Sequence, residues 1–259
     1  QNEPLNPGNC ASTYIPWQEE APLVKAMAAA FKQHALDTKI YVFDHNYNYD
    51  DKEDQIDYPV QIYKTLGNNF EGAEYVEGAA YHDYGGHPSE LEDITAQAPE
   101  KEVIFTESSI GTWNKGRDLP VRLMKDMENL VLGTVNRNCK AVLVWNFMLD
   151  TNRGPNLDGG CQTCYGAIDI NPENYTEYTL NSHYYVITHM SAVVQPGAVR
   201  IGCNVPDETI LTAAFQNPDG TLSVVMNNLA EEEKQVSVQL SGKTFCVTLP
   251  ARSVVSCKW

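Results

Sequence analysis

The sequence alternates helix-like and strand-like segments through residues 19–146, and this alternation constrains the fold more than any other feature. The strand-like runs are short and apolar, and they lie at about 39–43, 78–81, 102–107 and 140–145. The helix-like segments lie at about 19–36, 57–67, 88–97 and 119–137. Strands that alternate with helices form a parallel sheet with helical crossovers. The first part of the chain is therefore predicted to be an α/β fold.

The pattern changes after residue 181. One further helix is predicted over Ser182–Val194, and six short alternating runs follow it. These runs lie at 199–203, 210–216, 222–227, 235–240, 244–249 and 254–258. Turn sequences such as Asn217-Pro-Asp-Gly separate them. We expect two domains, an α/β domain at 1–181 and an antiparallel sheet of about six strands, one layer of a β-sandwich, at 182–259.

The charge of the chain limits its partners. The net charge is -16, and nearly all of the acidic excess lies in residues 1–181. Such a surface repels phosphate, so nucleic acid is not an expected partner. The longest apolar runs are strand-sized, well short of the ~18 residues of a membrane helix. No membrane span is therefore predicted.

The seven cysteines are an odd number, so at least one is unpaired within the chain. Cys161 and Cys164 are closely spaced in a glycine-rich loop, which favours a local disulfide or structural thiols. Zinc would need a second pair or nearby histidines, and a thioredoxin-like site would need a helix after a strand. An acidic run at Asp50, Asp51, Glu53 and Asp54 reads as a solvated loop without a calcium-loop pattern. We expect no metal and no cofactor.

Polar and aromatic residues gather at the predicted strand ends, where parallel α/β folds place their catalytic groups. They are Asn2, Glu3, Asp44, His45, Asn46, His82, Tyr84, Glu107, Trp145 and Asn146. Two glutamates on separate strands suit glycoside hydrolysis, in which one carboxyl group protonates the leaving oxygen and the other attacks or directs water. Trp17 and Trp113 join Tyr84 and Trp145 as candidate platforms for sugar faces. Asn2 is placed to bind a sugar 2-hydroxyl group.

Some of these residues have an equally simple structural interpretation. His45 can be a satisfied loop residue, and a glutamate at a strand end is often only exposed. His183 and His189 are interpreted as helix packing or capping residues. The residues alone therefore leave a sugar site as one of several interpretations.

Five blocks in order resemble one enzyme family, glycoside hydrolase family 30. The blocks are Asn2-Glu3-Pro4, Phe43-Asp-His-Asn-Tyr47, Ala80-Tyr-His82-Asp-Tyr84, Phe105-Thr-Glu107-Ser, and Trp145-Asn146 with Arg153-Gly-Pro155. The junction from His183 to Gly202 is also similar. The resemblance implies the C-terminal part of a (β/α)₈ barrel, from the end of strand four to strand eight, followed by a β-sandwich.

The resemblance also implies roles for the site residues. Glu3 would be the general acid/base and Glu107 the nucleophile, with the two carboxyl groups about 5–5.5 Å apart. The pKa of Glu3 is expected to be raised by burial and by the charge of Glu107, whereas Glu107 stays ionised through hydrogen bonds from Tyr84 or His82. The remaining strand-end residues and Trp113 would bind the sugar.

The implied function is that of a retaining O-glycosyl hydrolase acting on β-glucosidic bonds. A β-1,6-glucan is the favoured substrate, glucosylceramide-like β-glucosides come next, and xylan is a third option. The resemblance implies a secreted or periplasmic protein. The alternative, from a different class of function, is a non-catalytic carbohydrate-binding protein or an inactive fragment of such an enzyme.

The length of the chain raises one further expectation. A full barrel takes about 250 residues by itself, whereas only the first 181 residues precede the predicted sandwich. We therefore expect that the N-terminal half of the barrel, or a second copy of the chain, is needed to complete the fold.

Overall fold

The computed structural model describes residues 1–259 except 9–11, 48–54, 56, 206 and 241. The acidic residues Asp50, Asp51, Glu53 and Asp54 and the cysteine Cys10 lie outside the described residues. The chain forms two compact units, each made of two stretches. The first unit holds residues 1–108 and 137–143, and the second holds 109–136 and 144–259. The predicted domain boundary at residue 181 is a different division and stays a prediction.

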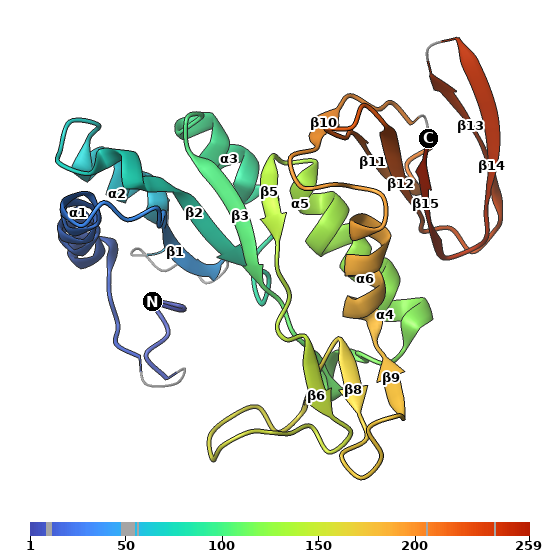
Figure 1. Cartoon of the computed structure of the whole chain (residues 1–259), viewed down its shortest axis with the longest axis horizontal. Coiled ribbons are helices and arrows are strands. Elements are labelled where there is room, and N and C mark those ends of the chain that lie inside the picture. The colour runs from blue at the N-terminus through green and yellow to red at the C-terminus, as the bar shows by residue number, and fades with distance from the viewer. Residues whose placement is uncertain (9–11, 48–54, 56, 206, 241) are drawn as a thin grey trace. The chain divides into compact units, whose positions relative to one another are not determined.

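The first unit is built on a four-stranded parallel sheet with the order β1-β2-β3-β5 (Figure 1). Its strands are β1 (Ile40–Asn46), β2 (Val76–His82), β3 (Glu102–Glu107) and β5 (Cys139–Val142). Its helices are α1 (Trp17–Gln33), α2 (Tyr58–Leu66), the 3₁₀ turn η1 (Ala73–Tyr75) and α3 (Glu90–Gln97). The alternation of strands and helices confirms the predicted α/β architecture of this unit.

Apolar side chains from the sheet and its helices form the core of the first unit. Val42, Ala79 and Phe105 of the strands are fully buried, as are Ile62 of α2 and Leu91 of α3. Buried strand side chains on successive positions are typical of parallel sheets covered by helices. The sheet is thus a rigid base for the side chains at its carboxyl edge.

Two local details of the first unit differ from the sequence prediction. Asp57 precedes α2 but makes no side-chain cap; its backbone is left-handed and its Oδ1 accepts a hydrogen bond from Gln97. Gly67 ends α2 with positive φ, as expected of a glycine stop. The strand predicted to reach residue 145 ends at Val142, and the register between β3 and β5 shifts between Val103 and Phe105.

The second unit begins with short elements around a helical segment. These elements are β4 (Ile110–Gly111), the 3₁₀ turn η2 (Thr112–Asn114), α4 (Leu119–Asp126), the π-helical η3 (Met127–Leu132) and α5 (Gly133–Val135). Small strands and one helix follow as β6 (Met148–Asp150), β7 (Cys164–Tyr165), β8 (Ile168–Ile170), β9 (Tyr178–Leu180) and α6 (Ser182–Ser191). The helix predicted over Ser182–Val194 therefore ends three residues early, at Ser191.

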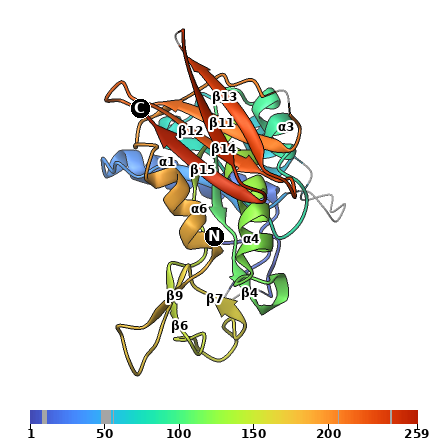
Figure 2. The same cartoon turned by 90° about the vertical axis from the view of Figure 1, so that its right-hand side faces the viewer.

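All six strands predicted for residues 199–258 are present, but they form two sheets rather than one. The strands are β10 (Val199–Ile201), β11 (Ile210–Gln216), β12 (Leu222–Asn228), β13 (Lys234–Leu240), β14 (Lys243–Leu249) and β15 (Ser253–Lys258). The order β10-β11-β12-β15 makes one antiparallel sheet, and β13 pairs with β14 in a separate hairpin. Figure 2 shows this hairpin across the face of the larger sheet.

Apolar packing explains why the hairpin forms a second layer. Ile210, Val224 and Met226 of the larger sheet are buried together with Leu249 of β14. Val236, Val238 and Val247 of the hairpin are packed against this group. Two sheets with facing apolar sides are the arrangement of a β-sandwich.

Among the described helices, none combines the length and the apolarity that crossing a membrane requires.

Candidate active site

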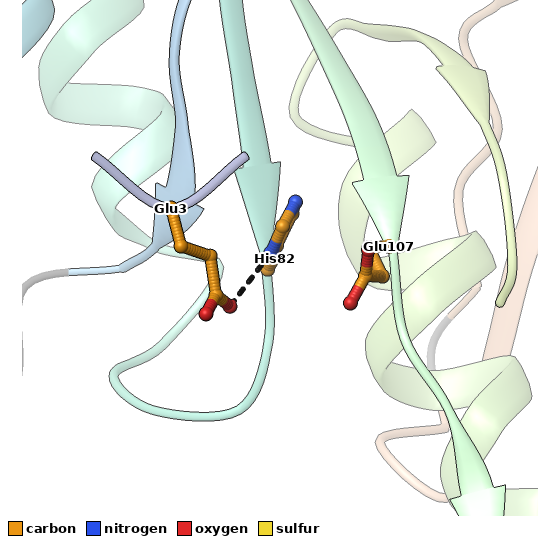
Figure 3. A group of neighbouring side chains, drawn as sticks. All are labelled: Glu3, His82 and Glu107. Atoms are coloured by element: carbon orange, nitrogen blue, oxygen red, sulfur yellow. Dashed lines mark hydrogen bonds and ion pairs between the residues drawn. The ribbon is translucent and has the colours of Figure 1, made fainter. Parts of the chain in front are cut away.

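The candidate site lies at the carboxyl edge of the parallel sheet in the first unit. His82 ends β2 and Glu107 ends β3, and Figure 3 shows both beside Glu3, which comes from the segment before α1. The backbone N–H of Glu3 donates to the carbonyl oxygen of Asp44 at 2.9 Å. This bond ties the N-terminal segment to the end of β1, so that three chain segments bring their functional groups together.

A bulge in β1 places Asp44. Phe43 pairs with Ala80 and His45 pairs with Tyr81, so Asp44 is an extra residue between two successive rungs of the ladder. Phe43 and Asp44 both have positive φ, at 77° and 50°. A non-glycine residue in this region is strained, and bulges are frequent beside active sites, where they re-aim a side chain. Here the bulge directs Asp44 toward His82.

His82 lies between two carboxylates. Its Nδ1 is 3.0 Å from Oε1 of Glu3, and its Nε2 is 3.1 Å from Oδ1 of Asp44. A neutral imidazole has only one N–H, so donation to both carboxylates requires the imidazolium form. Burial acts to lower the pKa of His82, but the hydrogen bonds to Asp44 and Glu3 outweigh it and raise the pKa from 6.5 to about 9.

Each carboxylate partner of His82 has a second donor. Nδ2 of Asn6 donates to Oε2 of Glu3 at 2.9 Å, and Oγ1 of Thr106 donates to Oδ1 of Asp44 at 2.7 Å. Burial acts to raise the pKa values of Glu3 and Asp44, but these bonds and those from His82 lower both. The expected rise in the pKa of Glu3 is therefore wrong for this structure.

Glu107 has the opposite electrostatic balance. Burial raises its pKa above the ordinary 4.5, and the charges of Glu3 and Asp44 add to the rise. The charge of His82 and a hydrogen bond from the Tyr84 hydroxyl to Oε1, at 3.0 Å, act against it. The predicted bond from Tyr84 to Glu107 is thus present, although it does not reverse the direction of the shift.

Two further predicted residues have contacts within the protein. Oδ1 of Asn46 accepts the backbone N–H of Tyr84 at 3.0 Å, and Nδ1 of His45 accepts the backbone N–H of Asn46 at 2.8 Å. Both side chains are buried. These bonds shape the loop that carries Tyr84, and direct contact of either residue with a sugar stays a prediction. Asn2 is exposed.

Trp113, Trp145 and Asn146 belong to the second unit. Trp113 is half exposed, whereas Trp145 and Asn146 are partly buried. Trp145 forms an isolated bridge with Ser109, and the peptide bond between Trp145 and Asn146 is cis. Their role in sugar binding also stays a prediction.

Sequence reasoning missed Asn6 and Thr106. Thr106 directly precedes Glu107 at the end of β3, and the strand period places the two side chains on opposite faces of the sheet, so the period gave no signal for its bond to Asp44. Asn6 follows Glu3 by three residues in an irregular segment, and no periodicity indicates its contact.

Glu3, His82 and Glu107 are also the one group that meets metal-ligand distances within the described ranges, with one ligand atom from each lying within 4.8 Å of the others. His82 does not fit this use, because Glu3 and Asp44 occupy both of its ring nitrogens and its raised pKa keeps it protonated at neutral pH. The arrangement is better suited to moving a proton than to holding a cation.

Comparison with known proteins places the chain among glycoside hydrolases. Residues 197–257 match the glycosyl hydrolase family 30 beta sandwich domain. The endo-1,6-beta-D-glucanase neg1 of Aspergillus fumigatus is 27% identical over 270 residues, which cover 99% of this chain and 50% of that protein. The putative glucosylceramidase 1 of Caenorhabditis elegans is 28% identical over 213 residues, covering 74% of this chain and 39% of that protein.

The structural comparison extends the likeness to the whole chain. The endo-beta1,6-glucanase BT3312 superposes with a TM-score of 0.94 at 52% sequence identity, covering 100% of this chain and 57% of that one. The chain spans about half the length of the curated glucanases that it matches. Its parallel sheet is part of a (β/α)₈ barrel, and its antiparallel sheets form the β-sandwich. Residues 197–257 therefore match the β-sandwich domain of glycoside hydrolase family 30, and the whole chain is similar to an endo-β-1,6-glucanase.

Proposed function

We propose that the protein containing this chain hydrolyses β-glucosidic bonds by double displacement, with Glu3 as acid/base and Glu107 as nucleophile. The observation that carries this proposal is the approach of the two side chains, whose nearest ligand oxygens lie within 4.8 Å of each other. Retaining glycosidases hold their carboxyl groups about 5–5.5 Å apart, whereas inverting enzymes leave about 6.5–9.5 Å for a water molecule. The short separation supports retention.

The first step forms a glycosyl–enzyme ester. Glu107 attacks the anomeric carbon, the bond from this carbon to the leaving oxygen breaks, and Glu3 gives a proton to that oxygen. In the second step Glu3 removes a proton from water, the water oxygen attacks the anomeric carbon, and Glu107 leaves as a carboxylate. The pair of Glu3 and His82 ends the cycle with the number of protons with which it began.

The pair of Glu3 and His82 supplies the proton for the first step. An ionised Glu3 beside an imidazolium holds as many protons as a neutral carboxylic acid beside a neutral imidazole. The proton on Nδ1 of His82 needs to cross only the 3.0 Å hydrogen bond to Oε1 of Glu3. Coupled groups titrate as a pair, so the lowered pKa of Glu3 and the raised pKa of His82 describe one shared proton.

The relatives favour a β-1,6-glucan as the substrate. BT3312, which is 52% identical, and fungal relatives at 27% are all named as endo-1,6-glucanases. Relatives named as putative glucosylceramidases support glucosylceramide-like β-glucosides as the second candidate. A polymeric substrate agrees with a secreted or periplasmic location, which we propose for the protein.

Release of reducing sugar from β-1,6-glucan tests the proposal, and proton NMR of the first product tests retention. We expect the β-anomer to appear first, and we expect Glu107→Gln and Glu3→Gln to abolish or strongly reduce turnover of the glucan. Glu71→Gln is a matched control, because Glu71 is an exposed glutamate of the same unit.

Three outcomes contradict parts of the proposal. Initial release of the α-anomer excludes double displacement. Full turnover by Glu107→Gln excludes the assigned nucleophile. A folded protein that binds the glucan without cleaving it favours the non-catalytic carbohydrate-binding alternative.

A further inference from the structure

A cavity of about 270 Å³ lies in the first unit, at the opposite end of the parallel sheet from the catalytic groups. Its wall is formed by the end of α2, by the segment that leads through η1 to Val76, and by the turn before β3. Val76 begins β2 and His82 ends it, and the seven residues of this strand span about 20 Å. The cavity is therefore separate from the candidate active site.

The segment that leads to β2 is anchored at two points. Gly72 lies so close to α1 that a Cβ atom on it would be 2.2 Å from the carbonyl oxygen of Ala28. The carbonyl oxygen of Glu74 accepts Nζ of Lys39 at 2.9 Å, and its carboxylate lies 3.2 Å from Nζ of Lys32. This part of the wall is thus held by contacts within the protein, as is usual for small-molecule sites.

One part of the wall is apolar. Leu66, Phe70 and Ala73 line the cavity, and each is only partly buried. Small-molecule sites typically combine such apolar surface with a few polar groups that orient the ligand. The apolar part suits the C–H groups of a bound molecule.

Lys101 places hydrogen-bond donors in the wall. Its Nζ donates to the carbonyl oxygen of Val76 at 2.6 Å and lies 5.5 Å from the centre of the Tyr63 ring. An ammonium group has three N–H donors, and Lys101 has no carboxylate at ion-pair distance among the residues that the structure describes. Two of its donors are therefore available to a ligand.

Glu100 and Tyr63 add groups of a different kind. Burial raises the pKa of Tyr63, and the charge of the exposed Glu100 adds to the rise, so the carboxylate lies near the phenol. The hydroxyl group of Tyr63 is buried and has no hydrogen-bond partner in the described part of the chain, whereas buried polar groups are normally paired. The wall thus combines a cation, a carboxylate and an unpaired hydroxyl group.

This combination favours a neutral polyhydroxy ligand over an ion. Glu74 and Glu100 would repel an anion, and Lys101 would repel a cation. The described residues that meet metal-ligand distances lie at the other end of the sheet. Sugar hydroxyl groups both donate and accept hydrogen bonds, so one pyranose ring can bind Lys101 and Glu100 together. The cavity is near the lower limit of about 300 Å³ for small-molecule sites, which suits a ligand of one or two rings.

We propose that this cavity is a second sugar-binding site, which holds a mono- or disaccharide remote from the catalytic groups through Lys101 and Glu100. That the sugar is a glucosyl unit rests on the proposed function. Cleavage of a glucan releases short sugars beside the protein, so a product of that reaction is the ligand that the site meets.

Amide NMR of the catalytically silent Glu107→Gln protein, titrated with the β-1,6-linked disaccharide of glucose, tests the site without turnover. We expect the backbone signals of residues 66–74 to shift with sugar concentration. We expect Lys101→Met and Glu100→Gln, each added to this protein, to weaken the binding roughly tenfold. Glu100→Gln changes an exposed side chain, so it tests the site even where Lys101→Met does not fold.

Lys64→Met and Glu71→Gln are the matched controls. Each removes a charge of the same sign from an exposed side chain of the same unit, outside the wall of the cavity. Both should bind the disaccharide as tightly as their parent does. Thermal unfolding of each variant verifies that the sample is folded.

Three results overturn the proposal. If the signals of residues 66–74 do not respond to the disaccharide, the cavity binds no such sugar. If the controls weaken binding as much as Lys101→Met and Glu100→Gln do, the effect belongs to surface charge in general. If inorganic phosphate moves these signals and the disaccharide does not, the site takes an anion. Failure of the proposed function appears separately, as absence of reducing sugar from β-1,6-glucan with the unmutated protein.

Discussion

Removal of the imidazolium between Glu3 and Asp44 is expected to change how stability depends on pH. In the folded protein the pKa of His82 is raised from 6.5 to about 9. Each tenfold change in proton affinity corresponds to about 1.4 kcal/mol. Protonated His82 therefore contributes about 3 kcal/mol to the free energy of unfolding, an order-of-magnitude figure for a side chain that is 1% exposed.

The sign follows from the direction of the shift. The folded state binds the proton more tightly than the unfolded state, so the contribution is fully present below pH 6.5 and is lost as the pH rises through about 9. The pKa values of Glu3 and Asp44 are lowered, so both are ionised throughout this range and do not add to the change.

Chemical denaturation of the protein and of His82→Gln at pH 6 and pH 10 measures the effect. We expect the difference in unfolding free energy between the two proteins to shrink by about 3 kcal/mol from the lower to the higher pH. His87→Gln, which changes an exposed histidine of the same unit, serves as control. Parallel pH profiles for the protein and His82→Gln would refute the assignment of a shared buried proton to His82.

Three further substitutions test other parts of the structure. Tyr84→Phe removes a hydrogen bond that lowers the pKa of Glu107, so the acid limb of the pH–activity profile should move to higher pH. Asp126→Asn breaks a fully buried ion pair with Arg122 and should cost about 3–5 kcal/mol in denaturation experiments. Gly78→Ala would place a Cβ 1.9 Å from a backbone oxygen of β3 and should destabilise the sheet by about 1–3 kcal/mol.

Matched variants separate these effects from general damage. Glu128→Gln changes an exposed acid in the helical segment after Asp126, and Gly202→Ala adds a Cβ that meets nothing within 4 Å. Both variants should have a free energy of unfolding close to that of the unmutated protein. An unchanged acid limb of the pH–activity profile in Tyr84→Phe contradicts the first prediction. If Asp126→Asn or Gly78→Ala loses no more unfolding free energy than its control, the prediction for that variant is wrong.

The sequence predicted the elements of the sheet well, because burial leaves a strong pattern. Residues 102–107 were expected as a strand and form β3, and the six runs after residue 199 all form strands. Their division into two sheets was not predictable from alternation. Alternation shows that one face of a strand is buried, but it does not show which neighbouring strand provides the cover.

The candidate residues were identifiable from their positions at strand ends, whereas their electrostatics were not. Glu107 ends β3 and Glu3 is hydrogen-bonded to the end of β1, yet the pKa of Glu3 is lowered and that of Glu107 is raised. The difference depends on which carboxylate receives the Nδ1 proton of His82, at 3.0 Å. That contact joins residues 79 positions apart in the sequence, and no local pattern records it.

The bulge in β1 connects the fold to the chemistry. In a regular strand without the bulge, Asp44 would pair with a residue of β2, and every later side chain of β1 would lie on the opposite face. Because Asp44 stands outside the pairing, its carbonyl oxygen accepts Glu3 and its carboxylate accepts His82. Glu20 of α1 accepts the backbone N–H of Phe43 at 3.3 Å and so helps to hold the strained backbone. The strained backbone at Phe43 and Asp44 thus holds both ends of the hydrogen-bonded chain Glu3–His82–Asp44.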